Sequence, residues 1–234
     1  MKPLFLLIPG MLNDARIWAD VATQIDSWAE VRIADVLTQG SICDMAHDAL
    51  AQLSDVPPER PVYLVGFSMG GYVAIELLAT HPARWHAALL MSTTCLPDSA
   101  QSAAGREKAM AAFAADFEAT IQGVALRGLA QANASLQSRL CDMMRSVGAD
   151  TAIRQTHAIL RRTDHRNALA SLQLPVHILC GRQDRITPPA WSQTMAETIA
   201  ASTLHWVDDA GHMLPLEQPQ AVAQVLSQML TQCK

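Results

Sequence analysis

The 234-residue chain has little that would suit it to nucleic acid or to a membrane. Its 17 Lys and Arg are outnumbered by 22 Asp and Glu, for a net charge of -5, whereas binding to phosphates needs a basic face. No apolar run approaches the roughly 20 residues that a membrane-spanning helix requires. The composition therefore argues against a nucleic-acid partner and against a membrane protein.

Cysteines are also few. There are five, an odd number without a C-x-x-C pair: Cys43, Cys95, Cys141, Cys180 and Cys233. The pattern fits reduced thiols and neither a disulfide framework nor a zinc site. The N-terminal apolar run is too short for a signal peptide, because Pro9-Gly10 interrupts it. We therefore expect a cytoplasmic protein without a metal.

Short apolar runs alternate with helix-length segments along most of the chain. The runs are Leu4–Ile8, Val31–Ala34, Val62–Val65, Ala87–Met91, Val176–Cys180 and Leu204–Val207. Several are apolar at every position, which indicates strands covered on both faces. The helix-length segments span residues 14–26, 41–54, 69–80, 188–200 and 218–231. This alternation predicts an α/β fold, a mostly parallel sheet of about six strands flanked by helices.

The stretch of residues 97–174 breaks the alternation, because it contains no convincing strand. Apolar side chains recur there at three- and four-residue steps, which predicts one apolar helix face: Met110, Phe113, Phe117, Ile121 and Val124. Ligands of such sheets bind outside the carboxyl ends of the strands. We expect residues 97–174 to form an all-helical cap over that edge, and residues 1–96 and 175–234 to form the core.

A glycine-rich turn follows the third predicted strand. Gly66-Phe67-Ser68-Met69-Gly70 reads G-x-S-x-G between a strand and a helix, the context of a nucleophile elbow. The tight turn presents the Ser68 hydroxyl clear of the sheet, and the small glycines let strand and helix approach. The Met69 amide lies at the helix N-terminus, where a developing negative charge is favoured. Ser68 is therefore the candidate nucleophile.

A serine hydroxyl needs a base, and the position of His212 singles it out among eight histidines. It follows the last predicted strand, at the sheet edge to which Ser68 would point. Asp184 follows the strand before it, on the same edge, and can orient the imidazole. Asp208 and Asp209 are rival acids, although their closeness to His212 suits them better to shaping its loop. The other seven histidines are expected to be structural: His47, His81, His86, His157, His165, His177 and His205.

The blocks GFSMGG, GRQDRITPP and GHMLPLEQP resemble the α/β-hydrolase superfamily, in its small, helically capped bacterial carboxylesterase and lactonase-like branches. The resemblance covers the whole chain, and the order Ser68, Asp184, His212 is that of the superfamily. It implies an oxyanion hole of two backbone N–H groups, from Met69 and, by position, Met11. Pro9 stands where a histidine is common in that loop, and the histidine is not the donor.

Taken together, these features predict a serine hydrolase that cleaves a carboxylic ester, lactone or thioester through an acyl-enzyme. Two alternatives stay open: a non-hydrolytic enzyme of the same fold, such as a lyase or a perhydrolase-like protein, and a ligand-binding protein without turnover. The chain has no metal-ligand constellation, phosphate loop or dinucleotide fingerprint, so we expect no cofactor.

The later part of the insertion carries a local excess of positive charge. Arg154, Arg161, Arg162, His165 and Arg166 are offset there only by Asp164. If the segment stays helical past Leu160, the first four of these residues share one broad sector. They form either a solvated face or a site that attracts an anionic small ester or lactone, or a phosphopantetheine carrier protein.

Overall fold

One parallel sheet of six strands organises the molecule, and the computed structural model describes its residues 2–231. The strand order is β2-β1-β3-β4-β5-β6 and every neighbouring pair is parallel, which confirms the predicted parallel sheet of about six strands. The bounds are β1 Leu4–Ile8, β2 Glu30–Ile33, β3 Val62–Phe67, β4 Ala87–Met91, β5 Val176–Gly181 and β6 Ser202–Val207. All six predicted strands are thereby confirmed, with ends that move by up to two residues. Cys233 lies outside the described residues.

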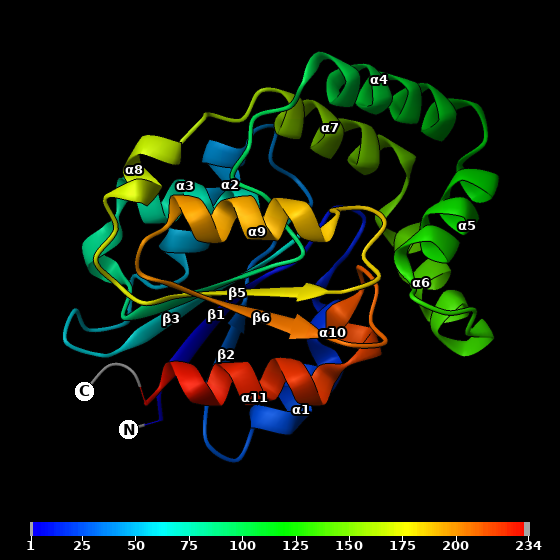
Figure 1. Cartoon of the computed structure of the whole chain (residues 1–234). Helices are drawn as coiled ribbons and strands as arrows, with labels where there is room; N and C mark the ends of the chain where they lie inside the picture. Colours follow the sequence, from blue (N-terminus) through cyan, green and yellow to red (C-terminus); the bar gives the residue numbers. More distant parts are fainter. Residues whose placement is uncertain (1, 232–234) are drawn as a thin grey trace.

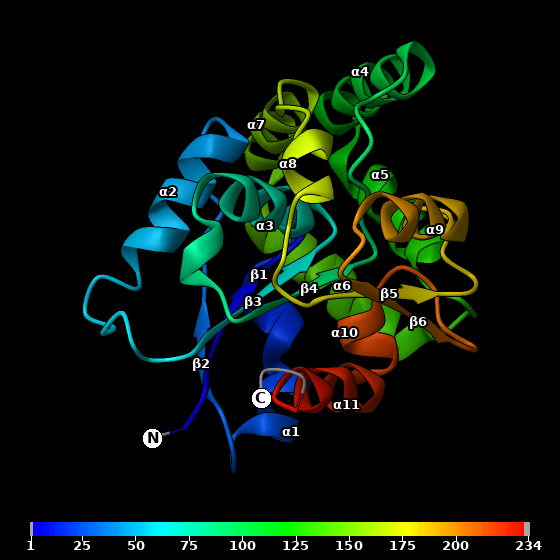
Figure 2. The same cartoon turned by 60° about the vertical axis from the view of Figure 1, so that its left-hand side comes forward.

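Helices cover both faces of this sheet (Figures 1 and 2). On one face lie α1 (Ala19–Ile25) and α11 (Pro219–Met229), and on the other lie α2 (Ile42–Ala51), α3 (Met69–Thr80) and α9 (Pro189–Thr198). Strand β1 is buried at every position, with alternate side chains in the two hydrophobic cores. Burial on both faces explains why the strand is apolar throughout.

The predicted helical segments are confirmed: the one at residues 69–80 has the predicted bounds, and the other four are shorter. The segment predicted at residues 14–26 begins with a 3-10 turn, Ala15–Trp18, before α1. A second 3-10 turn, Pro82–Arg84, follows α3, and a short helix that the pattern did not predict, α10 (Leu214–Glu217), follows His212. Within residues 2–231, no helix is long and apolar enough to cross a membrane.

The segment between β4 and β5 is helical, as its sequence predicted. It contains α4 (Ala100–Ala115), α5 (Phe117–Gly128), α6 (Ala134–Val147), α7 (Ala149–Leu160) and α8 (Arg166–Ala170). Figure 1 shows α4 and α7 beside each other above the sheet, and α5 and α6 at its side. We call residues 97–174 the helical insertion.

The prediction of one continuous apolar helix face in the insertion was wrong. Asp116 separates two helices. It follows the last residue of α4, and its side chain accepts a hydrogen bond from the Ala119 amide as the N-cap of α5. Phe113 and Phe117 therefore lie on different helices, although their ring centroids are still 6.0 Å apart. An N-cap aspartate competes with helix continuation, and a purely hydrophobic periodicity does not register it.

Candidate active site

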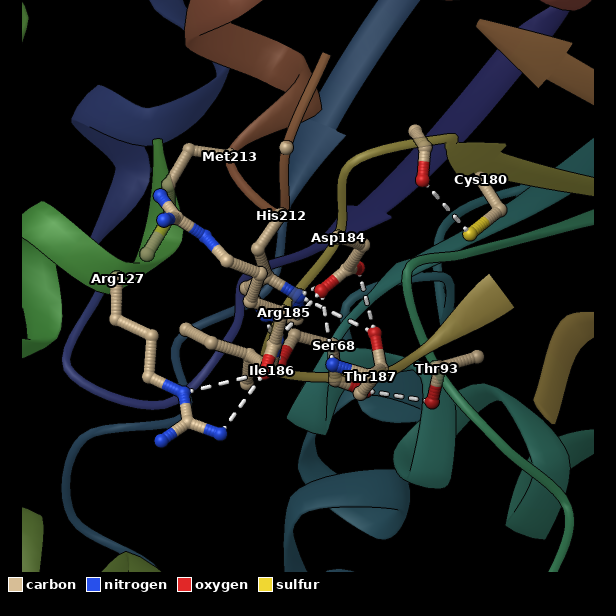
Figure 3. Close-up of polar contacts among 12 residues, drawn as sticks. Ser68, Thr93, Arg127, Cys180, Asp184, Arg185, Ile186, Thr187, His212 and Met213 are labelled. Carbon is tan, nitrogen blue, oxygen red and sulfur yellow. Dashed lines mark hydrogen bonds and ion pairs between the residues drawn. The ribbon is translucent and has the colours of Figure 1, made fainter. Parts of the chain in front are cut away.

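Ser68 sits on a strained turn between β3 and α3. Its φ of 53° and ψ of -115° lie outside the conformations that L-residues favour. Neighbouring backbone holds it there: the Ser68 amide donates to the Met91 carbonyl at 2.9 Å, and the Thr93 hydroxyl donates to the Ser68 carbonyl at 2.9 Å (Figure 3). The surrounding fold thus keeps the hydroxyl above the carboxyl end of the sheet.

Two glycines near Ser68 allow neighbouring backbone segments to pack closely. A Cβ on Gly66 would lie against the Gly70 carbonyl and the Ala74 side chain, so this glycine lets α3 approach β3. A Cβ on Gly70 would lie against the carbonyls of Ile8 and Pro9 instead. Gly70 therefore brings the start of α3 against the loop that follows β1, which is where the second oxyanion donor was predicted.

The fold brings Ser68, His212 and Asp184 together from three separate loops (Figure 3). The His212 Nε2 atom lies 2.9 Å from Ser68 Oγ, and its Nδ1 atom lies 2.9 Å from Asp184 Oδ2. His212 and Asp184 are both only 3% exposed. One imidazole therefore links the hydroxyl to a buried carboxylate, as a nucleophile, base and orienting acid require.

Asp184 is held as an ionised carboxylate. Its Oδ1 atom accepts the Ile186 and Thr187 amides, each at 2.8 Å, and its Oδ2 atom accepts the Thr187 hydroxyl at 2.7 Å. Burial alone would raise the pKa of Asp184, but the facing His212 and the Thr187 hydrogen bonds outweigh burial and lower it below its ordinary value. The side chain is thus a negatively charged acceptor facing the imidazole.

The rival acids and the other histidines lie elsewhere. Asp208 pairs with Arg182 at 2.8 Å with an 83% exposed side chain, and Asp209 occupies a left-handed turn with a φ of 52°. Both lie in the loop before His212, and neither is hydrogen-bonded to the His212 side chain among the described residues. Among the other histidines, His165 contacts Glu76, and the rings of His177 and His205 stack on each other.

The loop after β1 lies against the start of α3 and lines the same pocket as Ser68. The Asn13 amide donates to the Gly10 carbonyl at 3.2 Å, and Leu12 has a φ of 61°. The Leu12 amide is engaged by the Gln155 side chain at 3.0 Å. In the described part of the chain, neither the Met11 amide nor the Met69 amide donates to an acceptor. Both amides are thus available to a ligand.

Three residues that support this arrangement were missed by the sequence analysis: Thr187, Gln155 and Glu217. Thr187 follows Asp184 by three residues, a turn pattern that could have been recognised. Gln155 is fully buried on α7, and it donates to the Val36 carbonyl at 3.0 Å while it accepts the Leu12 amide. No local pattern predicts that contact, because its partners lie more than 100 positions away in the chain.

A pocket of about 430 Å³ opens beside Ser68 and His212. The core contributes Met11, Tyr72 and Trp191 to its lining, and the helical insertion contributes Arg106, Phe113 and Arg127 among others. Figure 3 shows Arg127 reaching the loop that carries Asp184, where its Nε and Nη2 atoms donate to the Arg185 carbonyl at 3.1 and 3.0 Å. The insertion therefore forms one wall of the pocket and contacts the acid loop.

The cationic residues between positions 154 and 166 do not form the shared positive helix face that the sequence suggested. Helix α7 ends at Leu160, and Arg162 and Arg166 pair with Asp98 and Asp164, at 2.8 and 2.6 Å. Arg154 binds the Leu37 carbonyl, and His165 lies 2.7 Å from Glu76. None of these residues lines the pocket. Across residues 2–231, no cluster of His, Cys, Asp and Glu resembles a metal site.

A serine on a strand-turn-helix elbow, with an acid and a histidine from later strands of a parallel sheet, defines the α/β-hydrolase class. Residues 34–219 match the Hydrolase_4 family, described as serine aminopeptidase, S33. The chain belongs to this family.

Similar proteins come from several bacteria. The chain is 26% identical to a pimeloyl-[acyl-carrier protein] methyl ester esterase of Aeromonas salmonicida, over 96% of this chain and 94% of that protein. It is also 26% identical to RutD of Pseudomonas savastanoi, which is named for carbamate hydrolysis, over 93% of this chain and 89% of that protein.

A solved structure shares the whole fold. A thermophilic esterase from Thermogutta terrifontis superimposes with a TM-score of 0.87 at 22% identity, over 100% of this chain and 90% of that one. The fold comparison thus extends through the helical insertion.

Proposed function

We propose that this protein is a serine hydrolase of carboxylic esters, with Ser68 as the nucleophile, His212 as the general base and Asp184 as the orienting acid. The observation that carries the proposal is the pair of 2.9 Å contacts that the His212 ring makes to Ser68 Oγ and to Asp184 Oδ2. Esterases among the similar proteins support the same reaction class.

The reaction has two halves. As Ser68 Oγ attacks the ester carbonyl carbon, its proton passes to His212 Nε2, and the tetrahedral intermediate then expels the alcohol, which takes that proton. Water attacks the acyl-enzyme in the second half with the same base, releasing the acid and restoring Ser68. The charge of Asp184 stabilises the imidazolium that forms in each half.

The negative oxygen of each tetrahedral intermediate needs donors in place beforehand. We assign this role to the Met11 and Met69 amides, since both lie in the pocket lining beside Ser68. Met69 also begins α3, and its amide therefore adds the favourable end of the helix dipole. Gln155 is a positioning residue here, because it binds the next amide along the loop, that of Leu12.

Residues 97–174 act as a cap on a core formed by residues 1–96 and 175–234. Support comes from the pocket, whose lining draws Arg106, Phe113, Val124 and Thr156 from the insertion. The cap thereby sets which substrates fit. We expect small esters or lactones, or an ester carried on an acyl-carrier protein, the substrate class named for the Aeromonas relative.

We place this activity in the cytoplasm. The free thiols Cys43, Cys95, Cys141 and Cys180 support that location, since reduced cysteines are typical of it.

The test is hydrolysis of p-nitrophenyl acetate and butyrate, with a serine-directed phosphonate as a covalent probe. We expect Ser68→Ala to lower kcat by at least about 10³-fold without a change in fold, because only oxyanion and binding contributions remain. Mass spectrometry should find the phosphonate on Ser68. An adduct on another serine, or undiminished turnover in Ser68→Ala, would refute the assignment.

A further inference from the structure

The substrate pocket has a charged wall. Among the described residues that line it, two are arginines, Arg106 and Arg127, and none is an aspartate or glutamate. Most of the remaining lining is apolar, with side chains such as Phe113, Val124 and Ile159. In such surroundings a cation has few competing water molecules, and its attraction to a bound anion is stronger than at a surface.

Arg106 belongs to a group of three charges. Asp98 Oδ2 accepts hydrogen bonds from Arg106 Nε and from Arg162 Nη1, both at 2.8 Å, and Oδ1 accepts weaker bonds from the same two guanidiniums. The three side chains are 12%, 23% and 8% exposed for Asp98, Arg106 and Arg162. Two positive charges share one negative charge, so the group keeps one net positive charge.

Arg162 and Arg106 differ in how many of their guanidinium N–H groups are already hydrogen-bonded. Arg162 also donates to the Ile159 and Leu96 carbonyls, at 2.8 and 2.9 Å, and its guanidinium lies over the Tyr72 ring at 4.5 Å. Its four Nη hydrogens therefore all have partners. Arg106 donates two of its five N–H groups to Asp98, through Nε and Nη2, and the Tyr72 side chain can accept a third, which leaves two for a ligand. Arg106 is also the one of the two that lines the pocket.

We propose that Arg106 binds a carboxylate of the substrate, so that the ester cleaved at Ser68 carries a second, anionic end. This inference rests on the proposed esterase function and narrows it to esters of dicarboxylic acids. The unused guanidinium N–H groups suit a carboxylate, and the single net charge of the group would be neutralised by one. Asp98 and Arg162 hold the Arg106 side chain in place before the substrate arrives.

Hydrolysis of matched ester pairs tests this inference. One series consists of mono-p-nitrophenyl esters of dicarboxylic acids of increasing length, and the other of p-nitrophenyl alkanoates with the same number of carbons. For wild type we expect kcat/KM to favour the anionic ester by about 10- to 100-fold at the length that spans Ser68 to Arg106, as one charge-assisted hydrogen bond implies. The preference should shrink with added salt.

Substitution of Arg106 should remove the preference. We expect the ratio of kcat/KM between the two series to fall about 10- to 100-fold in Arg106→Gln and to recover in part in Arg106→Lys, which keeps the charge. Arg166→Gln is the matched control, because Arg166 lies in the same insertion, is exposed and pairs with Asp164 away from the pocket. It should leave both series unchanged.

The outcomes separate this inference from the proposed function. Equal use of anionic and neutral esters by wild type at every length would overturn the role of Arg106, while leaving the esterase proposal intact. An unchanged ratio in a folded Arg106→Gln variant would overturn it as well. Turnover of no ester in either series would instead count against the proposed function. Because the wild-type comparison stands alone, a variant that fails to fold does not remove the test.

Discussion

Glu217 fastens the loop of His212 to the helical insertion. Its Oε2 atom accepts the Ala130 amide at 2.7 Å, and its Oε1 atom accepts the Gly211 and Met213 amides, both at 3.1 Å. These two amides flank His212, and the His212 amide itself donates to the Gly128 carbonyl at 2.7 Å. One carboxylate therefore holds three backbone amides from two parts of the chain. We predict that it contributes to both stability and catalysis.

The magnitude follows from the two carboxylate oxygens. Glu217→Gln can keep the two bonds at Oε1, but it presents an NH₂ group to the Ala130 amide, so one charge-assisted bond is lost and a donor is left unpaired. We expect a loss of about 1.5–3 kcal/mol in the free energy of unfolding. Glu217→Ala removes all three acceptors, and we expect about 3–5 kcal/mol.

Urea unfolding and ester hydrolysis together measure the effect. We expect kcat to fall about 10- to 100-fold in Glu217→Gln, because a small displacement of His212 spoils its alignment with Ser68. Glu197→Gln is the control: Glu197 is exposed on α9, and its one side-chain hydrogen bond among residues 2–231 is with Gln193, so the stability of this variant should stay within about 0.5 kcal/mol of wild type. If Glu217→Gln unfolds and turns over like wild type, the proposed fastening role is refuted.

Three further predictions concern the site. Asp184→Asn should lower kcat by up to about 10⁴-fold through the wrong imidazole tautomer, whereas Asp208→Asn should keep near wild-type turnover; the reverse result would assign the acid to Asp208. Because the lowered pKa of Asp184 keeps it ionised, its stabilising contribution is present above about pH 4 and lost as pH falls through its folded value. Circular dichroism and turnover followed together as pH falls check this: both should decline as Asp184 gains a proton, and a fold and rate that stay constant well below about pH 4 would contradict it. Gly70→Ala should lower both thermal stability and kcat, since the new Cβ would push the loop after β1 away from Ser68; an unchanged melting temperature would contradict this.

Local sequence patterns predicted most of the strands and the turn that carries Ser68. Fully apolar runs such as Leu4–Ile8 predicted strands covered on both faces, because burial of both faces leaves no position for a polar side chain. The G-x-S-x-G turn predicted the strained Ser68, since its spacing encodes a backbone conformation directly. Where a polar residue interrupted a hydrophobic period, as at Asp116, the same reasoning failed.

The sequence by itself determined the strands and the elbow at Ser68, because both depend on neighbouring residues. It also determined that Asp184 and His212 lie at the same sheet edge as Ser68, because each follows a strand and parallel strands end at one edge. Only the tertiary structure decided which cationic side chains are paired with carboxylates and which can still bind a ligand in the pocket. The five cationic residues near the end of the insertion mostly found partners, whereas Arg106, far from them in sequence, reached the pocket with donors unused. Pairing of charges, like the Gln155 and Glu217 contacts, depends on segments that meet only after the chain has folded.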